Sequence, residues 1–132
     1  MLLKEKLLLG SRPSSAIVAV SDLERAREFY GRTLGLKAVD GHEDQVLEFR
    51  TGDTKLVVYV SEFAGTNKAN AVVWNGGDDF DAIVDQLREQ GVAFEEYPEL
   101  GMDIARGVHS RGGFKAVWFM DPDGNLLHLT NM

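Results

Sequence analysis

The chain has 132 residues, of which 44% are hydrophobic and 27% charged, and its formal net charge is −7 at pH 7. This length allows one domain with a substantial core and is too short for two ordinary domains. The acidic balance disfavours nucleic acid as a partner, because binding to its phosphates depends on Lys and Arg. It suits a cationic ligand, although solubility alone explains it equally well. The absence of cysteine excludes disulfides, thiolate metal sites and a cysteine nucleophile.

The N-terminal residues are rich in leucine, but they do not form a targeting signal. Lys4, Glu5 and Lys6 interrupt the leucines before a signal-peptide core is long enough. No apolar window approaches the length of a membrane span. We therefore expect a cytoplasmic protein without a membrane partner.

The first half of the chain predicts one helix and four strands. Residues 15–20, SAIVAV, are a β-branched run typical of a strand. Ser21 and Glu24 have the spacing of a capping box, which predicts a helix start. The helix continues through Leu23, Ala26, Tyr30 and Leu34 at helical spacing, and Gly35 ends it. Three further strands are predicted at residues 36–39, 45–50 and 55–60.

The second half repeats this order. An apolar run at residues 71–74 precedes Asp78 and Asp79, either of which suits a helix cap. The helix is predicted from apolar residues at i, i+3, i+4 and i+7, namely Phe80, Ile83, Val84 and Leu87. Gly91 ends the helix. Strands are then predicted at residues 92–96, 114–120 and 126–130.

Each half therefore reads β-α-β-β-β, with Leu23 and Phe80 standing 57 residues apart. This repeat predicts a single α+β domain of paired βαβββ modules, with a cup-shaped sheet and helices on its outer face. The predicted parts are an N-terminal segment at residues 1–14, a first module at 15–61, a linker at 62–69 and a second module at 70–132.

Residues 121–125, DPDGN, predict a turn between the last two strands. This turn places Trp118 opposite His128. One face of the hairpin then carries Phe114, Ala116, Trp118, Met120, Leu126, His128 and Thr130. The other face is uniformly apolar and suits a position under a helix, with Val117, Phe119, Leu127 and Leu129.

Two stretches, VSDLERAREFYGRTLGL at residues 20–36 and WFMDPDGNLLHL at residues 118–129, resemble the vicinal oxygen chelate superfamily. That superfamily includes glyoxalase I, extradiol dioxygenases, fosfomycin-inactivating enzymes and bleomycin-resistance proteins. The resemblance extends over residues 15–130 and implies the paired-module fold. Both stretches are turn and packing chemistry, so they indicate a fold rather than a reaction.

Metal enzymes of this family hold one divalent ion in the cup of the sheet. The resemblance places their ligand positions at Ser15, at Val57 with Tyr59 next on the same face, at Asn70 or Ala71, and at His128. Only His128 is a good ligand, and one imidazole cannot supply the three donors that a catalytic metal needs. We therefore expect no metal cofactor, and a divalent metal on a displaced ligand set is the alternative.

His128 is the candidate catalytic residue, because an imidazole titrates near neutrality. Its alternative role is that of a cavity histidine hydrogen-bonded to Ser15, Tyr59 or water. The aromatic and methionine side chains are either cavity walls or ordinary core. The predicted ligand-binding set is Ser15, Tyr59, Trp74, Met102, Phe114, Trp118, Met120 and His128.

Residues 97–113, YPELGMDIARGVHSRGG, form the longest stretch without predicted structure and suggest a lid or binding loop. In that loop, Met102, Ile104 and Val108 are candidates to cover the cavity, and Arg106, His109 and Arg111 to contact an anion. A surface loop with solvated charges is the alternative. His42 is expected to be exposed in the turn at residues 40–44, and the pattern leaves open on which face Glu48 lies.

Three functions fit these patterns. The first, resembling the bleomycin-resistance branch, is a metal-independent homodimer that binds an apolar or aromatic small molecule, either neutral or cationic. The second is a glyoxalase- or dioxygenase-like enzyme that uses a displaced metal or His128 as acid or base. Three inward-facing donors near one point favour that enzyme. The third is a regulatory module with a filled cavity, in which Trp118 and Trp74 pack together.

Overall fold

The computed structural model describes residues 9–39 and 45–132. The start of the predicted N-terminal segment and the turn that contains His42 lie outside the described residues. In the described part of the chain, no helix is both long and apolar enough to cross a membrane.

The first module follows a short 3₁₀ turn, η1 (Leu9–Ser11). Its elements are β1 (Ala16–Val20), α2 (Leu23–Ala26), η2 (Arg27–Thr33), β2 (Lys37–Ala38), β3 (Val46–Thr51) and β4 (Thr54–Val60). The strands form sheet A in the order β1-β4-β3-β2, with β1 parallel to β4. The predicted strand positions hold to within two residues at each end.

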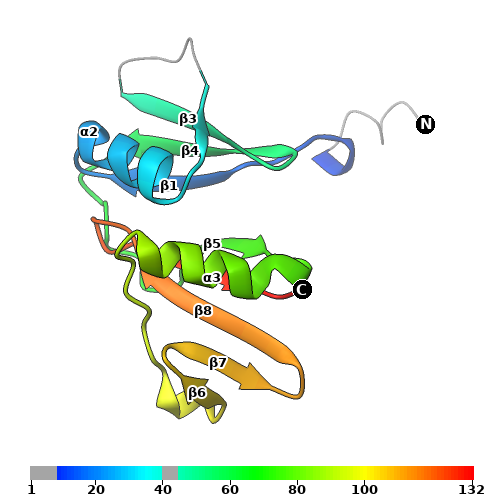
Figure 1. The fold of residues 1–132 in the computed structure, drawn as a ribbon. Coiled ribbons are helices and arrows are strands. Elements are labelled where there is room, and N and C mark those ends of the chain that lie inside the picture. The colour runs from blue at the N-terminus through cyan, green and yellow to red at the C-terminus, as the bar shows by residue number, and fades with distance from the viewer. Residues whose placement is uncertain (1–8, 40–44) are drawn as a thin grey trace.

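The second module contains one hairpin more than the first. Its elements are β5 (Asn70–Asn75), η3 (Gly77–Asp79), α3 (Phe80–Glu89), η4 (Pro98–Leu100), β6 (Asp103–Ala105), β7 (Val108–Arg111), β8 (Phe114–Met120) and β9 (Leu126–Thr130). They form sheet B in the order β5-β9-β8-β7-β6 (Figure 1). The predicted α+β fold of paired modules is confirmed, with two sheets whose edge strands β1 and β5 adjoin.

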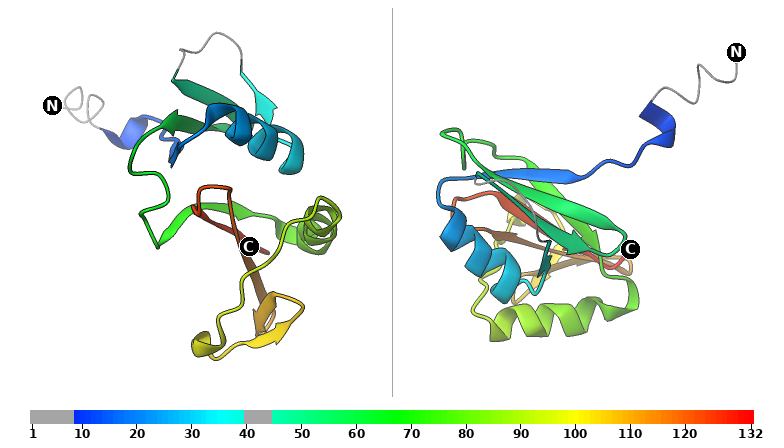
Figure 2. Two further views of the ribbon diagram at one scale, coloured as in Figure 1. Left: turned by 90° about the vertical axis from the view of Figure 1, so that its left-hand side faces the viewer. Right: turned by 90° about the horizontal axis from the view of Figure 1, so that it is seen from above.

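Both helices lie on the same side of the molecule, and the strands lie on the other (Figure 2). Alternate strand residues point toward the helices and form one apolar core that runs through both modules. Its largest fully buried side chains include Tyr30, Phe49, Phe80 and Phe119. We call the opposite side of the two sheets the open face. It carries the other set of strand residues, including Ile17 and Trp118.

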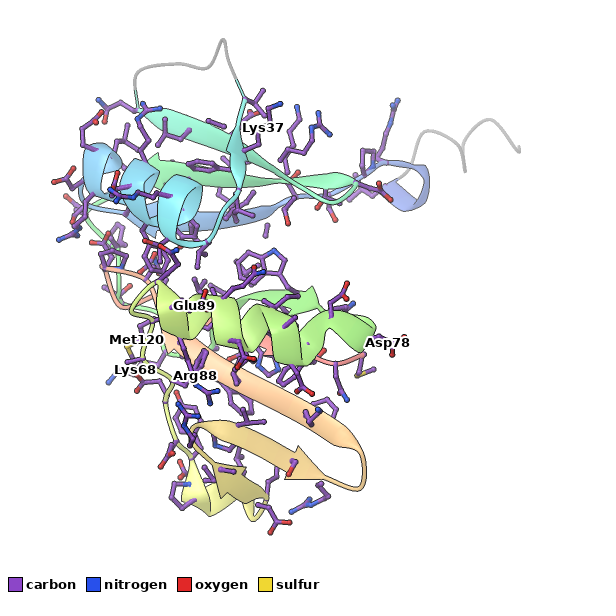
Figure 3. The ribbon with its side chains drawn as sticks, viewed as in Figure 1. Lys37, Lys68, Asp78, Arg88, Glu89 and Met120 are labelled. Atoms are coloured by element: carbon purple, nitrogen blue, oxygen red, sulfur yellow. The ribbon has the colours of Figure 1, made fainter. Side chains whose placement is uncertain are left out.

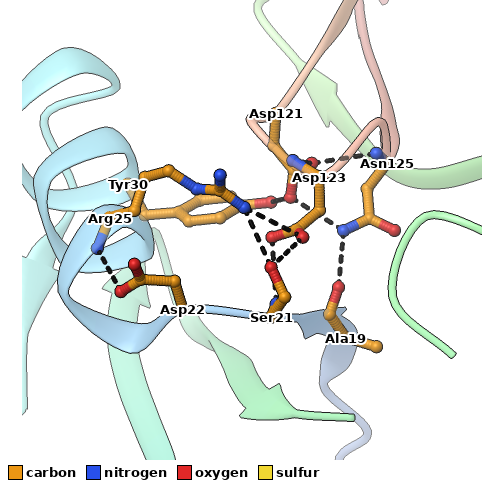
Figure 4. A network of polar contacts seen from close by, with 8 residues as sticks. All are labelled: Ala19, Ser21, Asp22, Arg25, Tyr30, Asp121, Asp123 and Asn125. Atoms are coloured by element: carbon orange, nitrogen blue, oxygen red, sulfur yellow. Dashed lines mark hydrogen bonds and ion pairs between the residues drawn. The ribbon is translucent and has the colours of Figure 1, made fainter. Parts of the chain in front are cut away.

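The two modules meet where the start of α2 contacts the turn between β8 and β9 (Figure 4). Asp123 accepts hydrogen bonds from the Ser21 hydroxyl at 2.6 Å and from the Ser21 backbone N–H, and it pairs with Arg25 at 3.0 Å. The buried Tyr30 donates its hydroxyl to Asp121 at 2.7 Å. Asn125 donates to the backbone carbonyl of Ala19 in β1. The DPDGN turn is therefore the joint between the modules.

Asp121 explains why this turn is stable when it is buried. One carboxylate oxygen accepts the backbone N–H groups of Asp123 and Asn125, and the other accepts Tyr30 and the Asn125 amide. A buried carboxylate is tolerated when several donors satisfy it. The pKa of Tyr30 rises above its ordinary value, because burial and the nearby Asp121 charge both disfavour the phenolate.

The helix cap differs from the prediction. Asp22, rather than Ser21, is the N-cap of α2, and its side chain accepts the Arg25 backbone N–H. The Ser21 hydroxyl donates to Asp123 instead. A sequence pattern shows only that a capping residue is near, because Ser and Asp are almost equally good caps. In the structure the Ser21 hydroxyl binds the distant Asp123, and Asp22 caps the helix.

The predicted strand at residues 92–96 is wrong, because this segment makes too few ladder bonds. It follows β8 with one backbone hydrogen bond, from Glu95 N–H to the Trp118 carbonyl. In the first module, Val39 makes the matching bond to Glu48 beside β2. The segment thus occupies the position of a β2 equivalent without completing a strand.

The stretch at residues 97–113 is not a structureless lid, because it folds into the β6–β7 hairpin. Arg106 and Gly107 form its two-residue turn with φ of 51° and 84°, as in a type I′ turn. Arg111 donates to the carbonyls of Leu100 and Gly101. Of the cations predicted to meet an anion, Arg111 is thus engaged with backbone, and His109 is fully buried.

Candidate functional site

The open face of sheet B places Trp118 directly opposite His128, as predicted from the alternation. Their rings are stacked, with centroids 4.4 Å apart and an interplanar angle of 19°. Val117 and Phe119 point to the other face, where they are buried in the core. The predicted division of the two faces of this hairpin is therefore confirmed.

Contacts with four neighbouring side chains hold Trp118 in place. Its indole N–H donates to the Asn70 side chain of β5 at 3.1 Å. The Tyr97 and His109 rings meet it edge to face, with centroids 5.4 and 4.9 Å away. The side chain stays partly exposed on the open face. We call Tyr97, His109, Trp118 and His128 the ring cluster.

His128 has one nitrogen in use. Its Nδ1 donates to the Val117 carbonyl at 3.1 Å, and Nε2 has no partner among the described residues. Among the described residues, His128 makes no hydrogen bond to Ser15 or Tyr59, the two side chains considered from the sequence. The pKa of His128 lies below its ordinary value, because burial disfavours the charged ring more than the Val117 hydrogen bond favours it. At neutral pH, Nε2 is therefore a hydrogen-bond acceptor.

Tyr97 was not among the predicted site residues, and His109 was predicted only as a candidate to contact an anion from a loop. The His109 Nε2 accepts the Tyr97 backbone N–H at 2.9 Å, so the ring proton is on Nδ1, which faces the Gly107 carbonyl at 3.0 Å. Both nitrogens are satisfied, so His109 supports the ring cluster rather than contacting an anion. The sequence did contain a signal for the position of His109. If residues 108–111, VHSR, are taken as a strand, their alternation places His109 on the open face.

The first module contributes a second part of the open face. Tyr59 is 36% exposed, and Ser15, one residue before β1, is exposed as well. Glu48 lies opposite Val57 on this face and forms an ion pair with Lys55 at 3.4 Å. The position of Glu48, which the sequence left open, is thus on the open face, with its carboxylate already paired.

Trp74 lies on the other face of sheet B. It pairs with Leu129, which points into the core, and its ring stacks on Phe119 at 6.5 Å. It therefore cannot share one cavity wall with Trp118, which corrects its place in the predicted set. The reason is that the run AVVW is apolar throughout and has no alternation to define a face. The filled-cavity condition, with both tryptophans packed together, is not met.

The remaining predicted residues are spread around the second module. Phe114 and Met102 are half-buried near the β6–β7 hairpin. Met120 is 46% exposed at the end of β8, where it borders a depression with Phe29 and Val92. Charged side chains such as Lys37, Asp78 and Glu89 lie on different elements around the outside (Figure 3).

The residues at the family's metal positions do not fit a metal ion. Ser15, Val57, Asn70 and His128 include one imidazole, and the Asn70 side-chain oxygen already accepts the Trp118 indole N–H. Across residues 9–39 and 45–132, no three His, Asp or Glu side chains gather as metal ligands would. Stable divalent sites need such a set of converging donors.

Comparison with known proteins agrees with this fold. A sequence profile of the Glyoxalase/Bleomycin resistance protein/Dioxygenase superfamily matches residues 12–129. Searching the curated proteins found no match.

Solved structures with different functions resemble the chain to a similar degree. A glyoxalase/bleomycin resistance protein/dioxygenase from Alicyclobacillus acidocaldarius has a TM-score of 0.69 at 18% identity, over 89% of this chain and 88% of that one. Lactoylglutathione lyase from Agrobacterium tumefaciens has a TM-score of 0.67 at 18% sequence identity, over 91% of this chain and 92% of that one. The fosfomycin resistance protein FosX from Mesorhizobium loti has a TM-score of 0.65 at 17% sequence identity, over 91% of both chains. At these identities the likeness is one of fold.

Proposed function

The chain belongs to the Glyoxalase/Bleomycin resistance protein/Dioxygenase superfamily, and on that premise we propose that it binds an aromatic small molecule on its open face without a metal. The observation that carries this proposal is the ring cluster. Three rings from separate segments, those of Tyr97, His109 and His128, converge on Trp118, and the indole is fixed by Asn70 and His128. A rigid aromatic surface binds a flat ligand with little loss of conformational entropy.

The proposed contacts follow from this geometry. The partly exposed Trp118 stacks on the ligand, and the Nε2 of His128, which has no partner in the described part of the chain, accepts a hydrogen bond from it. Ser15 and Tyr59 line the first-module side of the same face. The net charge of −7 favours a cation at long range, whereas Lys37, Arg50 and Lys55 stand opposite one another across β2, β3 and β4 on this face. Because these two charge distributions favour opposite ligand charges, the binding experiment compares ligands of different charge.

We also propose that the protein acts as a homodimer. Ile17, 58% exposed, and Val73, 55% exposed, lie near the adjoining edges of the two sheets. Exposed apolar side chains on one face are typical of a surface that a partner covers. Light scattering after gel filtration measures the mass directly, and a monomer at micromolar concentration contradicts the dimer.

The experiment for the proposed function is calorimetric titration in EDTA with flat aromatic probes of positive, zero and negative charge. The panel also includes bleomycin and fosfomycin, because the family description and the name of one similar structure refer to resistance to these compounds. Binding that persists in EDTA and weakens about tenfold in Trp118→Ala supports the proposal. The control is Phe63→Ala, which removes an exposed ring in the loop between β4 and β5. Binding that needs added metal, or that is unchanged in Trp118→Ala, contradicts it.

A second candidate function is acid–base catalysis at His128. The observation in its favour is that His128 is neutral near pH 7 and has a free Nε2 in the described part of the chain. Such a ring accepts a proton from a bound substrate. Lactoylglutathione lyase activity in EDTA that disappears in His128→Gln favours this candidate. Activity unchanged in that variant rules His128 out as the base.

A further inference from the structure

A pocket of about 280 Å³ lies between the two modules on the helix side of sheet B. Leu34 and Leu36, just after η2, form its first-module wall. Ile83 and Leu87 of α3, with Trp74 and Phe119 of sheet B, form the wall of the second module. The pocket is half-open to solvent, and it is separate from the open face on which the proposed function depends.

The sheet B side of this pocket is aromatic and is held in place. The rings of Trp74 and Phe119 are stacked with an interplanar angle of 14°. The Trp74 indole N–H donates to the Thr51 hydroxyl at 2.9 Å, which ties the ring to the first module. Phe119 is buried beneath this contact, so a ligand meets the partly exposed Trp74 ring, which is already in place and needs little reorganisation of the protein.

The chemistry of the lining selects the ligand. None of the side chains that line the pocket is ionisable, so a charged ligand loses its hydration without gaining an ion pair. Gln86 is exposed at the rim. Asn75 accepts the Thr130 hydroxyl through Oδ1, and its NH₂ group has no acceptor among the described residues, so it is able to donate. A ligand with a carbonyl or ring-nitrogen acceptor complements these two amides.

We propose that this pocket is a second binding site, for a neutral aromatic molecule of one or two rings that carries a hydrogen-bond acceptor. Its volume is near the lower end of the roughly 300–1,000 Å³ found for small-molecule sites. Because both modules line the pocket, an occupant holds them together and stabilises the folded chain by mass action.

The two tryptophans make the sites separately observable. The sequence contains Trp74 and Trp118 only, and they lie on opposite faces of sheet B. An ¹⁵N-labelled sample therefore gives two indole N–H signals, which Trp74→Phe and Trp118→Phe assign. Coumarin, a neutral two-ring lactone, is the probe. The expected result is a saturable shift of the Trp74 signal, with a midpoint that is independent of any shift of the Trp118 signal.

A variant at the rim tests the location. Gln86→Phe places a ring over the mouth of the pocket from an exposed helical position, so the fold is retained. It should weaken coumarin binding about tenfold. The matched control is Ala82→Phe, which adds the same ring to an exposed position of α3 outside the pocket and leaves binding within about twofold. An unmoved Trp74 signal, or equal binding by the two variants, overturns the proposal. A shift of the Trp118 signal alone overturns it too, while supporting the open face as the binding site.

Discussion

At the scale of single residues, the open face was easier to predict than the groups that support it. Trp118 and His128 share a face because period-two alternation and the turn length fix strand register. The role of Asn70 was not predictable, since its bond to the Trp118 indole joins residues 48 positions apart. His109 was misplaced because the short run VHSR, with three polar residues, resembles a loop until its strand is known.

The lowered pKa of His128 predicts how the stability of the protein depends on pH. Its pKa is lowered in the folded state, so the unfolded chain binds more protons once the pH falls through the ordinary histidine range. The free energy of unfolding should therefore fall as the pH is lowered from 7 to 5. In His128→Gln this fall should be smaller, as measured by urea denaturation at each pH.

The control for this experiment is Ser15→Ala, which changes the open face without removing a titratable group. It should keep the wild-type dependence on pH. A pH dependence in His128→Gln as steep as that of the wild type contradicts the assignment.

At the scale of elements, prediction succeeded where pattern and turn chemistry agreed. The strands β8 and β9 have the bounds that the apolar alternation and the DPDGN turn predicted. It failed at residues 92–96, because an apolar segment packed beside a strand has the same composition as a strand. The β6–β7 hairpin was missed because its strands are short and polar, although Gly107 is a turn signal between them.

Gly107 should be the most sensitive residue of that hairpin. Its φ is 84°, and an added Cβ would lie 2.6 Å from the Phe94 Cβ. Gly107→Ala should lower the free energy of unfolding by about 2–4 kcal/mol, from backbone strain and the steric clash together. The measurement is chemical denaturation followed by circular dichroism.

Gly112→Ala is the matched substitution, because Gly112 has a φ of 55° and open space around its Cα. It should cost only about 1–2 kcal/mol, from the backbone alone. Equal losses in the two variants would show that the contact with Phe94 relaxes freely.

At the scale of the whole molecule, the two modules are joined by polar contacts at the DPDGN turn and by the shared core. The repeat of 57 residues predicted both modules, but it could not show how they dock. Docking depends on partners such as Ser21 and Asp123, which are 102 positions apart. A repeat contains information about each unit and none about the surface between units.

Asp123 should contribute to this docking through its charge. Burial raises the pKa of Asp123, but the hydrogen bonds from Ser21 and the Arg25 charge outweigh it, so the pKa is lowered. The stabilisation is present above the ordinary aspartate pKa and is lost as the pH falls through the lowered value. Asp123→Asn should therefore cost about 1 kcal/mol at pH 7 and less in strong acid, by urea denaturation.

Asp53→Asn, an exposed carboxylate in the turn between β3 and β4, is the control and should change stability by less than about 0.5 kcal/mol. A loss for Asp123→Asn no larger than that of the control would assign the docking to apolar contacts alone.

The joint at the DPDGN turn also determines the order in which the chain folds. Its hydrogen bonds connect residues 91 to 106 positions apart, whereas the β3–β4 and β8–β9 hairpins close over short loops. Closing a long loop costs more chain entropy than closing a hairpin, so each module forms its sheet first and docking follows. During that interval the α2 surface of one chain is available to the turn of another. Refolding at high concentration therefore favours exchanged dimers over monomers, and dilution reverses this preference.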